Sequence, residues 1–114
     1  MLIMTLLMMT SLSAKAADQA DTFLRKDQPF KPARKAVIAH GWKPLNNTDP
    51  STLMGVDRVL YHAGYKEVYS CAMDIGVCIL QYQDKSGQCL SVFVKGEELK
   101  DIVVSDWSNQ CQQD

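Results

Sequence analysis

The four cysteines constrain this chain most, because their spacing decides which cross-links or metal sites the fold can hold. They are Cys71, Cys78, Cys89 and Cys111, separated by gaps of 7, 11 and 22 residues. Structural zinc sites usually take two thiolates from one Cys-x-x-Cys turn, and this spacing contains no such turn. An even number of cysteines in an oxidising compartment indicates disulfides instead. The sequence therefore predicts two disulfides, and neither a metal nor another cofactor.

Residues 1–16 indicate the compartment. An apolar run from Leu2 to Leu12 precedes Ala14-Lys15-Ala16, which puts small residues at the two positions that a signal peptidase reads. A membrane-spanning helix needs roughly 20 apolar residues, and this run is about half that length. We therefore expect a signal peptide over 1–16, cleavage before Ala17, and a soluble periplasmic or secreted product without a membrane insertion.

Cleavage would leave residues 17–114, which are 98 residues (114 − 16) and short enough for one domain. Lys15 leaves with the signal, so 11 Lys and Arg face 13 Asp and Glu, a net charge of −2. Proteins that bind nucleic acid through its phosphates carry a basic surplus. The charge therefore argues against a nucleic-acid partner. We expect a protein partner of unknown identity, and the oligomeric state stays open.

Helical patterns follow a polar stretch over 17–29, which we interpret as a mobile or short helical lead-in to a single domain over 30–114. Residues at three- and four-residue spacing between Pro32 and Gly41 predict a short amphipathic helix; they are Ala33, Ala36, Val37 and His40. A second helix is predicted over part of Leu53–Ala63, with Gly55 inside it at a cost of about 1 kcal/mol. Large aromatic side chains are needed in a small core, and we assign Trp42 and Trp107 to it.

The C-terminal third predicts a β-hairpin. Residues 78–83 and 89–94 are strand-like and flank a turn that ends in Gly87. With Gly87 in the left-handed conformation of a three-residue loop, one face of the hairpin is wholly apolar: Cys78, Leu80 and Tyr82 face Leu90, Val92 and Val94. Residues 65–71 and 102–107 predict further strands. The fold class is α+β, with one or two short helices on a small antiparallel sheet of three to four strands.

The hairpin also decides the disulfide pairing. Cys78 and Cys89 fall on opposite faces, and bridged Cα atoms lie about 4.4 to 6.8 Å apart, so a bridge between these two is disfavoured. A returning third strand would bring Cys111 beside Cys89. We therefore predict the pairs Cys71–Cys78 and Cys89–Cys111.

Few residues are candidates for catalysis. Bridged cysteines lack the thiolate that a nucleophile needs. His40 and His62 each stand just before a helix-ending glycine, which favours a role at the helix end or plain exposure over a general base. The carboxylates of Glu97, Glu98 and Asp101 fall on predicted turns. The sequence therefore predicts no catalytic, cofactor-binding or metal-binding residue, and a protein that is not an enzyme.

Several short motifs follow one another in a recognisable order. They are Ala33-Arg34, Gly41-Trp42-Lys43-Pro44, Gly64-Tyr65-Lys66-Glu67, Ser70-Cys71-Ala72, Asp84 to Gly87, and Gly96-Glu97. This order resembles a group of small exported bacterial proteins with no established activity, over residues 30–98 or so. The resemblance implies a shared fold and compartment and transfers no functional residue.

A rigid loop presented by a scaffold often carries binding, and Asp74, Ile75 and Gly76 form such a loop between Cys71 and Cys78. We therefore expect a non-catalytic binding module, such as an inhibitor or immunity-type protein acting on an envelope enzyme. One alternative is a structural or accessory component of an envelope assembly. Another is a small hydrolase, which would need a titratable group with a perturbed pKa in a cleft.

Overall fold

The structure is a computed structural model that describes residues 16–46, 48–72 and 75–111. Residues 1–15 of the expected signal peptide, and Asp74 of the expected contact loop, lie outside the described residues. The helices are α1 (Phe30–Ala39) and α2 (Val56–His62), and the strands are β1 (Lys43–Pro44), β2 (Val68–Ala72), β3 (Val77–Gln83), β4 (Cys89–Lys95) and β5 (Val103–Ser108).

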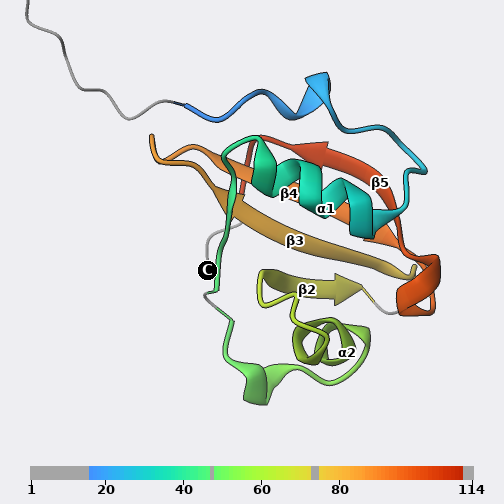
Figure 1. Ribbon diagram of the computed structural model, residues 1–114. Helices are drawn as coiled ribbons and strands as arrows, with labels where there is room; N and C mark the ends of the chain where they lie inside the picture. The colour runs from blue at the N-terminus through green and yellow to red at the C-terminus, as the bar shows by residue number, and fades with distance from the viewer. Residues whose placement is uncertain (1–15, 47, 73–74, 112–114) are drawn as a thin grey trace, which may run out of the picture.

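The strands form one antiparallel sheet around β3 (Figure 1). Strand β4 pairs with one edge of β3, and β5 pairs with the far edge of β4. The other edge of β3 is shared, because β2 pairs with its first half and β1 with its last two residues. The α+β class is thus confirmed, with five strands in a sheet that is only four strands wide at any point.

The predicted hairpin register is confirmed. Cys78 faces Val94, Leu80 faces Val92 and Tyr82 faces Leu90. The turn closes through a hydrogen bond from the Asp84 nitrogen to the Gln88 carbonyl oxygen at 3.0 Å, and Gly87 has a φ of +89°. A side chain is strained at that φ, so glycine is what allows the three-residue loop.

The core lies between this apolar face and α1, which crosses it (Figure 1). Helix α1 buries Phe30, Ala33 and Val37, and the sheet buries alternate residues of β3 and β4. Trp42 follows α1 and is 1% exposed, as expected for a core anchor. Trp107 is only partly buried, and its Nε1 donates to Oδ1 of Asp21 at 2.6 Å.

Helix α1 falls where the sequence predicts it, whereas α2 begins directly after Gly55, which was expected inside the helix. Helix α1 starts at Phe30, ahead of Pro32, whose missing N–H is not needed in a first turn. Gly55 stands before α2 rather than inside it, because its nitrogen donates to Oδ1 of Asp57 at 2.8 Å in a non-helical conformation. The Asp49 carboxylate accepts from the Ser51 nitrogen and so caps a separate 3-10 turn over Pro50–Thr52.

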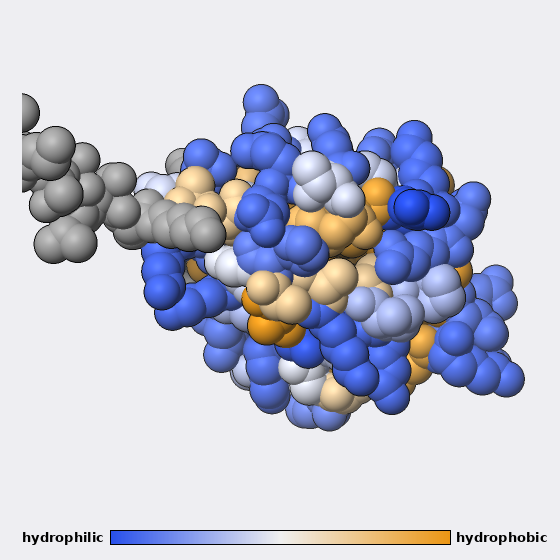
Figure 2. All heavy atoms as spheres, turned by 45° about the horizontal axis from the view of Figure 1, so that its top comes forward, coloured by the Kyte–Doolittle hydropathy of each residue, from blue (hydrophilic) through white to orange (hydrophobic). Residues whose placement is uncertain are grey.

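The lead-in over 17–29 contains a 3-10 turn over Ala20–Thr22 and packs against the domain. Ala17, Ala20 and Leu24 are buried members of the core. Further on, the Asp27 nitrogen donates to the Val104 carbonyl oxygen at 2.7 Å. The outward surface of this side of the molecule is mostly hydrophilic (Figure 2). Most side chains of the segment are exposed and polar, so its composition gives little sign of the few apolar side chains that are buried against the domain.

The predicted disulfide pairing is confirmed. Cys71–Cys78 joins β2 to β3 across a registered pair, and Cys89–Cys111 joins the start of β4 to the chain after β5. The closed loops differ in size, with sequence separations of 7 and 22 residues.

We predict that the larger loop makes its disulfide the more stabilising one. In the chain-entropy model, replacing Cys89 and Cys111 by alanine should cost about 3.4 kcal/mol, and replacing Cys71 and Cys78 about 2.4 kcal/mol. Urea unfolding of both double variants measures the two costs. A larger loss from the Cys71–Cys78 variant would show that native-state packing, and not loop closure, decides the order.

Candidate functional site

Glu67 is a fully buried carboxylate just before β2, and therefore the first candidate for chemistry. Its side chain is 0% exposed. Arg34 of α1 binds it with two nitrogens, Nε at 2.6 Å from Oε2 and Nη2 at 3.1 Å from Oε1. The hydroxyl of Tyr82 on β3 donates to Oε2 at 2.6 Å. Three separate elements thus meet at one carboxylate.

The electrostatics of this cluster favour fixed charges over proton transfer. The hydrogen bond to Glu67 raises the pKa of the Arg34 guanidinium above its ordinary value. Burial and the Glu67 carboxylate raise the pKa of the Tyr82 hydroxyl well above its ordinary value. Tyr82 therefore stays a neutral donor and Arg34 a cation, and both carboxylate oxygens are occupied. The cluster holds α1 on the sheet and offers no free acid or base.

The second candidate is a hollow of about 560 Å³ at the end of the sheet where β2 ends, β3 begins and β4 ends. Its lining comes from α2, both ends of the Cys71–Cys78 disulfide, the loop before β3 and the turn after β4. The lining residues are Val56, Cys71, Ala72, Ile75, Gly76, Cys78, Lys95, Gly96 and Glu97.

Two glycines allow the chain to form this wall. Gly96 has a φ of +145°, and a Cβ there would lie 3.0 Å from both the Asp101 carbonyl oxygen and the Ile102 Cα. Gly76 has a φ of +65°. Since other residues rarely adopt these conformations, the turns on both sides of the hollow depend on glycine.

The hollow is apolar inside and charged at one side. Ile75 lines this concave surface and is 68% exposed. Lys95 and Glu97 add one charge of each sign, and the Lys95 ammonium also lies 3.1 Å from Oδ1 of Asp27. This combination suits contact with an apolar group, and none of the described lining residues is a nucleophile with an adjacent base.

The residues singled out from the sequence are only partly brought together. Ile75 and Gly76 line the hollow. His62 is exposed on α2, whereas His40 lies at the end of α1, where its Nδ1 is 2.7 Å from Oδ2 of Asp18 and its ring stacks on Phe23. Sequence reasoning missed Val56 and the turn after β4 as parts of one site with the loop. The Gly96-Glu97 pair directly after a strand is the signal that could have indicated that turn.

Among the described residues, no three His, Cys, Asp or Glu side chains are grouped so that they could hold a metal ion. No helix in that part of the chain has the length and apolar character needed to cross a bilayer.

Comparison with known proteins supplies no relative. No family model, curated protein or solved structure matches the chain. The resemblance to small exported bacterial proteins therefore stays a prediction, and function has to be argued from the geometry of the site.

We predict that Glu67→Gln lowers the free energy of unfolding by about 3–5 kcal/mol, because the variant leaves the Arg34 charge partly buried without its partner. The matched control is Glu98→Gln, which removes an exposed pair with Lys100 at 3.6 Å. The control should cost at most about 1 kcal/mol. Urea unfolding measures both, and equal losses would show that the buried pair has no special weight.

Proposed function

We propose that this protein is a non-catalytic binding module, exported to the periplasm or the medium, that binds a partner protein through the hollow beside Cys71–Cys78. The observation that carries the proposal is the exposed Ile75 side chain at the border of an open, apolar-lined hollow. Exposed apolar groups that border a concave surface with a polar rim are characteristic of protein interaction sites.

The walls of the hollow support binding because they are held rigid. The Cys71–Cys78 disulfide closes one wall, Lys95 is the last residue of β4, and Gly96 follows it directly. A site that is ordered before binding loses less conformational entropy when the partner arrives. This favours a partner that inserts an apolar side chain into a preformed surface.

The size of the partner follows from how open the hollow is. A small ligand is usually enclosed over most of its surface, whereas Ile75 at the border of this hollow is 68% exposed. The partner class that fits is therefore a folded protein with an apolar anchor residue.

Export is part of the proposal. Two disulfides suit an oxidising compartment, and the leader over residues 1–16 has the composition of a signal peptide. Among partners in that compartment we favour an envelope enzyme that the module blocks, as an inhibitor or immunity-type protein.

The test places a photo-crosslinking amino acid at Ile75 and, as a control, at Ile38, which is 42% exposed on α1. After irradiation in the periplasm, the cross-linked partner is identified by mass spectrometry and purified. We expect capture from Ile75 and not from Ile38, and loss of the partner enzyme's activity when the module is added.

Ile75→Glu should then weaken binding to the purified partner by tenfold or more, since losing one central anchor costs about 2 kcal/mol. Ile38→Glu should bind as tightly as the wild type, and calorimetry compares the two. Equal binding by both variants would contradict the proposed site. A captured partner that is active in the presence of the module and part of a stable complex would instead favour an accessory role in an envelope assembly.

A further inference from the structure

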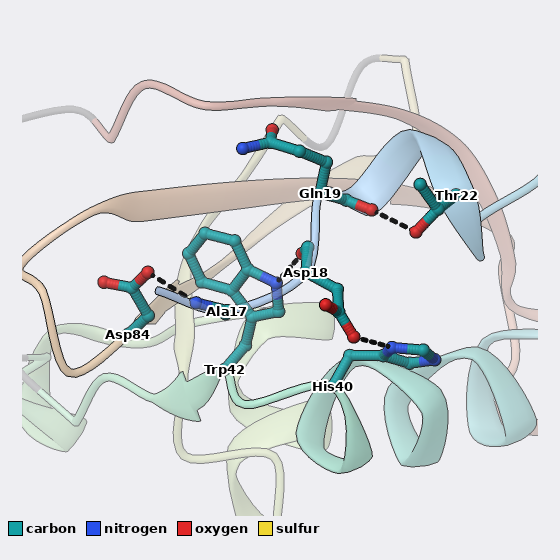
Figure 3. Close-up of polar contacts among 7 residues, drawn as sticks. All are labelled: Ala17, Asp18, Gln19, Thr22, His40, Trp42 and Asp84. Atoms are coloured by element: carbon teal, nitrogen blue, oxygen red, sulfur yellow. Dashed lines mark hydrogen bonds and ion pairs between the residues drawn. The ribbon is translucent and has the colours of Figure 1, made fainter. Parts of the chain in front are cut away.

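Ala17 would be the first residue after the expected cleavage, and its backbone nitrogen lies 3.0 Å from Oδ2 of Asp84 (Figure 3). Both residues are buried, with 8% of Ala17 and 6% of Asp84 exposed. They are 67 positions apart in the chain, so only the fold brings them together. A buried carboxylate is costly unless hydrogen bonds or an opposite charge compensate it.

The turn after β3 fixes the orientation of this carboxylate. Its Oδ1 accepts hydrogen bonds from the Ser86 nitrogen at 3.0 Å, the Ser86 hydroxyl at 2.7 Å and the Gln88 nitrogen at 2.8 Å. Burial disfavours the charged form, but the hydrogen bonds from Ala17, Ser86 and Gln88 outweigh it and hold the pKa of Asp84 below its ordinary value. Asp84 is therefore an anion at neutral pH, with Oδ2 directed at Ala17.

The surroundings of Ala17 are built for a small residue. Gly41 has a φ of +101°, and a Cβ on it would lie 3.3 Å from the Cβ of Ala17. Beside Ala17 is a hollow of about 250 Å³ that Lys85 also lines, which leaves room to solvate the N–H groups that do not face Asp84. The neighbouring Asp18 is held at both ends of its backbone, since its nitrogen donates to the His40 carbonyl oxygen and its own carbonyl oxygen accepts from Trp42 Nε1.

We propose that Asp84 is the binding site for the α-ammonium group of Ala17 that signal cleavage creates, and that this ion pair fastens residues 17–24 to the domain. The inference rests on the export and cleavage proposed above, but not on the hollow beside Cys71–Cys78 or on any partner.

The covalent step is ordinary hydrolysis by a signal peptidase. Water adds across the Ala16–Ala17 peptide bond, the C–N bond breaks, and Ala16 keeps the new carboxylate. The nitrogen of Ala17 becomes an amine, which is protonated at neutral pH because α-amino groups titrate at about 8. A neutral N–H donor is thereby replaced by a cation facing the same oxygen, and charge-assisted hydrogen bonds are roughly twice as strong as neutral ones.

The anchored segment continues across the molecule through further contacts. Asp18 Oδ2 lies 2.7 Å from His40 Nδ1, the Phe23 ring stacks on His40 at 4.1 Å between centroids, and Asp21 accepts from Trp107. Fixing the first residue therefore holds a segment that joins the end of α1 to β5.

The test uses the full chain, exported and purified, with its N-terminal residue determined by intact mass. Asp84→Asn removes the anionic partner of the amine. The matched control is Asp49→Asn, because Asp49 Oδ1 accepts from the nitrogen and hydroxyl of Ser51 in the same kind of turn but has no chain start beside it. We expect Ala17 as the N-terminus in every variant.

The reactivity of the α-amine reports the pair directly. Acylation of Ala17 near neutral pH should be about tenfold faster in Asp84→Asn than in the wild type or Asp49→Asn, which corresponds to the loss of about 1.4 kcal/mol of pairing. If Asp84→Asn does not fold, the native wild type is compared with the urea-unfolded wild type, and the native amine should be the slower by at least the same factor. An N-terminus other than Ala17, or equal rates, would overturn the proposal.

The pH dependence of stability gives an independent check. The stabilisation by Asp84 is present above the pKa of the unfolded carboxyl and is lost as the pH falls through its lowered folded value. The part due to the ammonium is lost as the pH rises through the pKa of that group. The difference in unfolding free energy between wild type and Asp84→Asn should therefore become smaller at both low and high pH. Asp18, His40 and Lys85 face the same hollow. Their contribution cancels when the two proteins are compared at the same pH. A difference in unfolding free energy that stays constant as the pH becomes alkaline would contradict the ion pair.

Discussion

The pairing of β3 on both of its edges is the constraint on which the rest of the structure depends. Strand β4 occupies one edge, while β1 and β2 divide the other. Alternate residues of β3 then have separate tasks: Cys78 bonds to β2, Leu80 fills the core and Tyr82 donates to Glu67. Asp84, which follows the strand, fixes the turn. A one-residue slip of β3 would exchange its two faces and remove all of these contacts together.

The elements that could be predicted from the sequence are those whose signals are local. The hairpin has a period of two, a glycine turn and a single register that keeps its apolar residues on one face. Its placement alone is enough to predict the disulfide pairing. The start of α2 cannot be predicted in the same way, because a glycine such as Gly55 within a helical pattern is compatible both with a weakened helix and with the beginning of one. Only the hydrogen bond from Gly55 to Asp57 distinguishes the two.

The parts that could not be predicted depend on residues far apart in the chain. Arg34 and Glu67 are 33 positions apart, and neither is distinguishable from a surface charge in the sequence. The candidate site shows the same limit. The loop with Ile75 and Gly76 was identified as a contact loop because disulfide-bonded cysteines enclose it, but the hollow also needs Val56 and the turn at Gly96, which only the fold places beside it.

The two proposals concern opposite ends of β3. Seven residues form this strand, and at about 3.3 Å per residue its ends are roughly 20 Å apart. Asp84 follows one end, and the hollow beside Cys71–Cys78 lies at the other. Because two unit charges this far apart interact by less than about 1 kcal/mol even at an effective dielectric constant of about 20, a change of charge at Asp84 should have little effect on the electrostatics of the hollow. One end of the sheet can therefore fix the start of the mature chain while the other stays free to bind, and the rigid strand between them keeps the two roles separate.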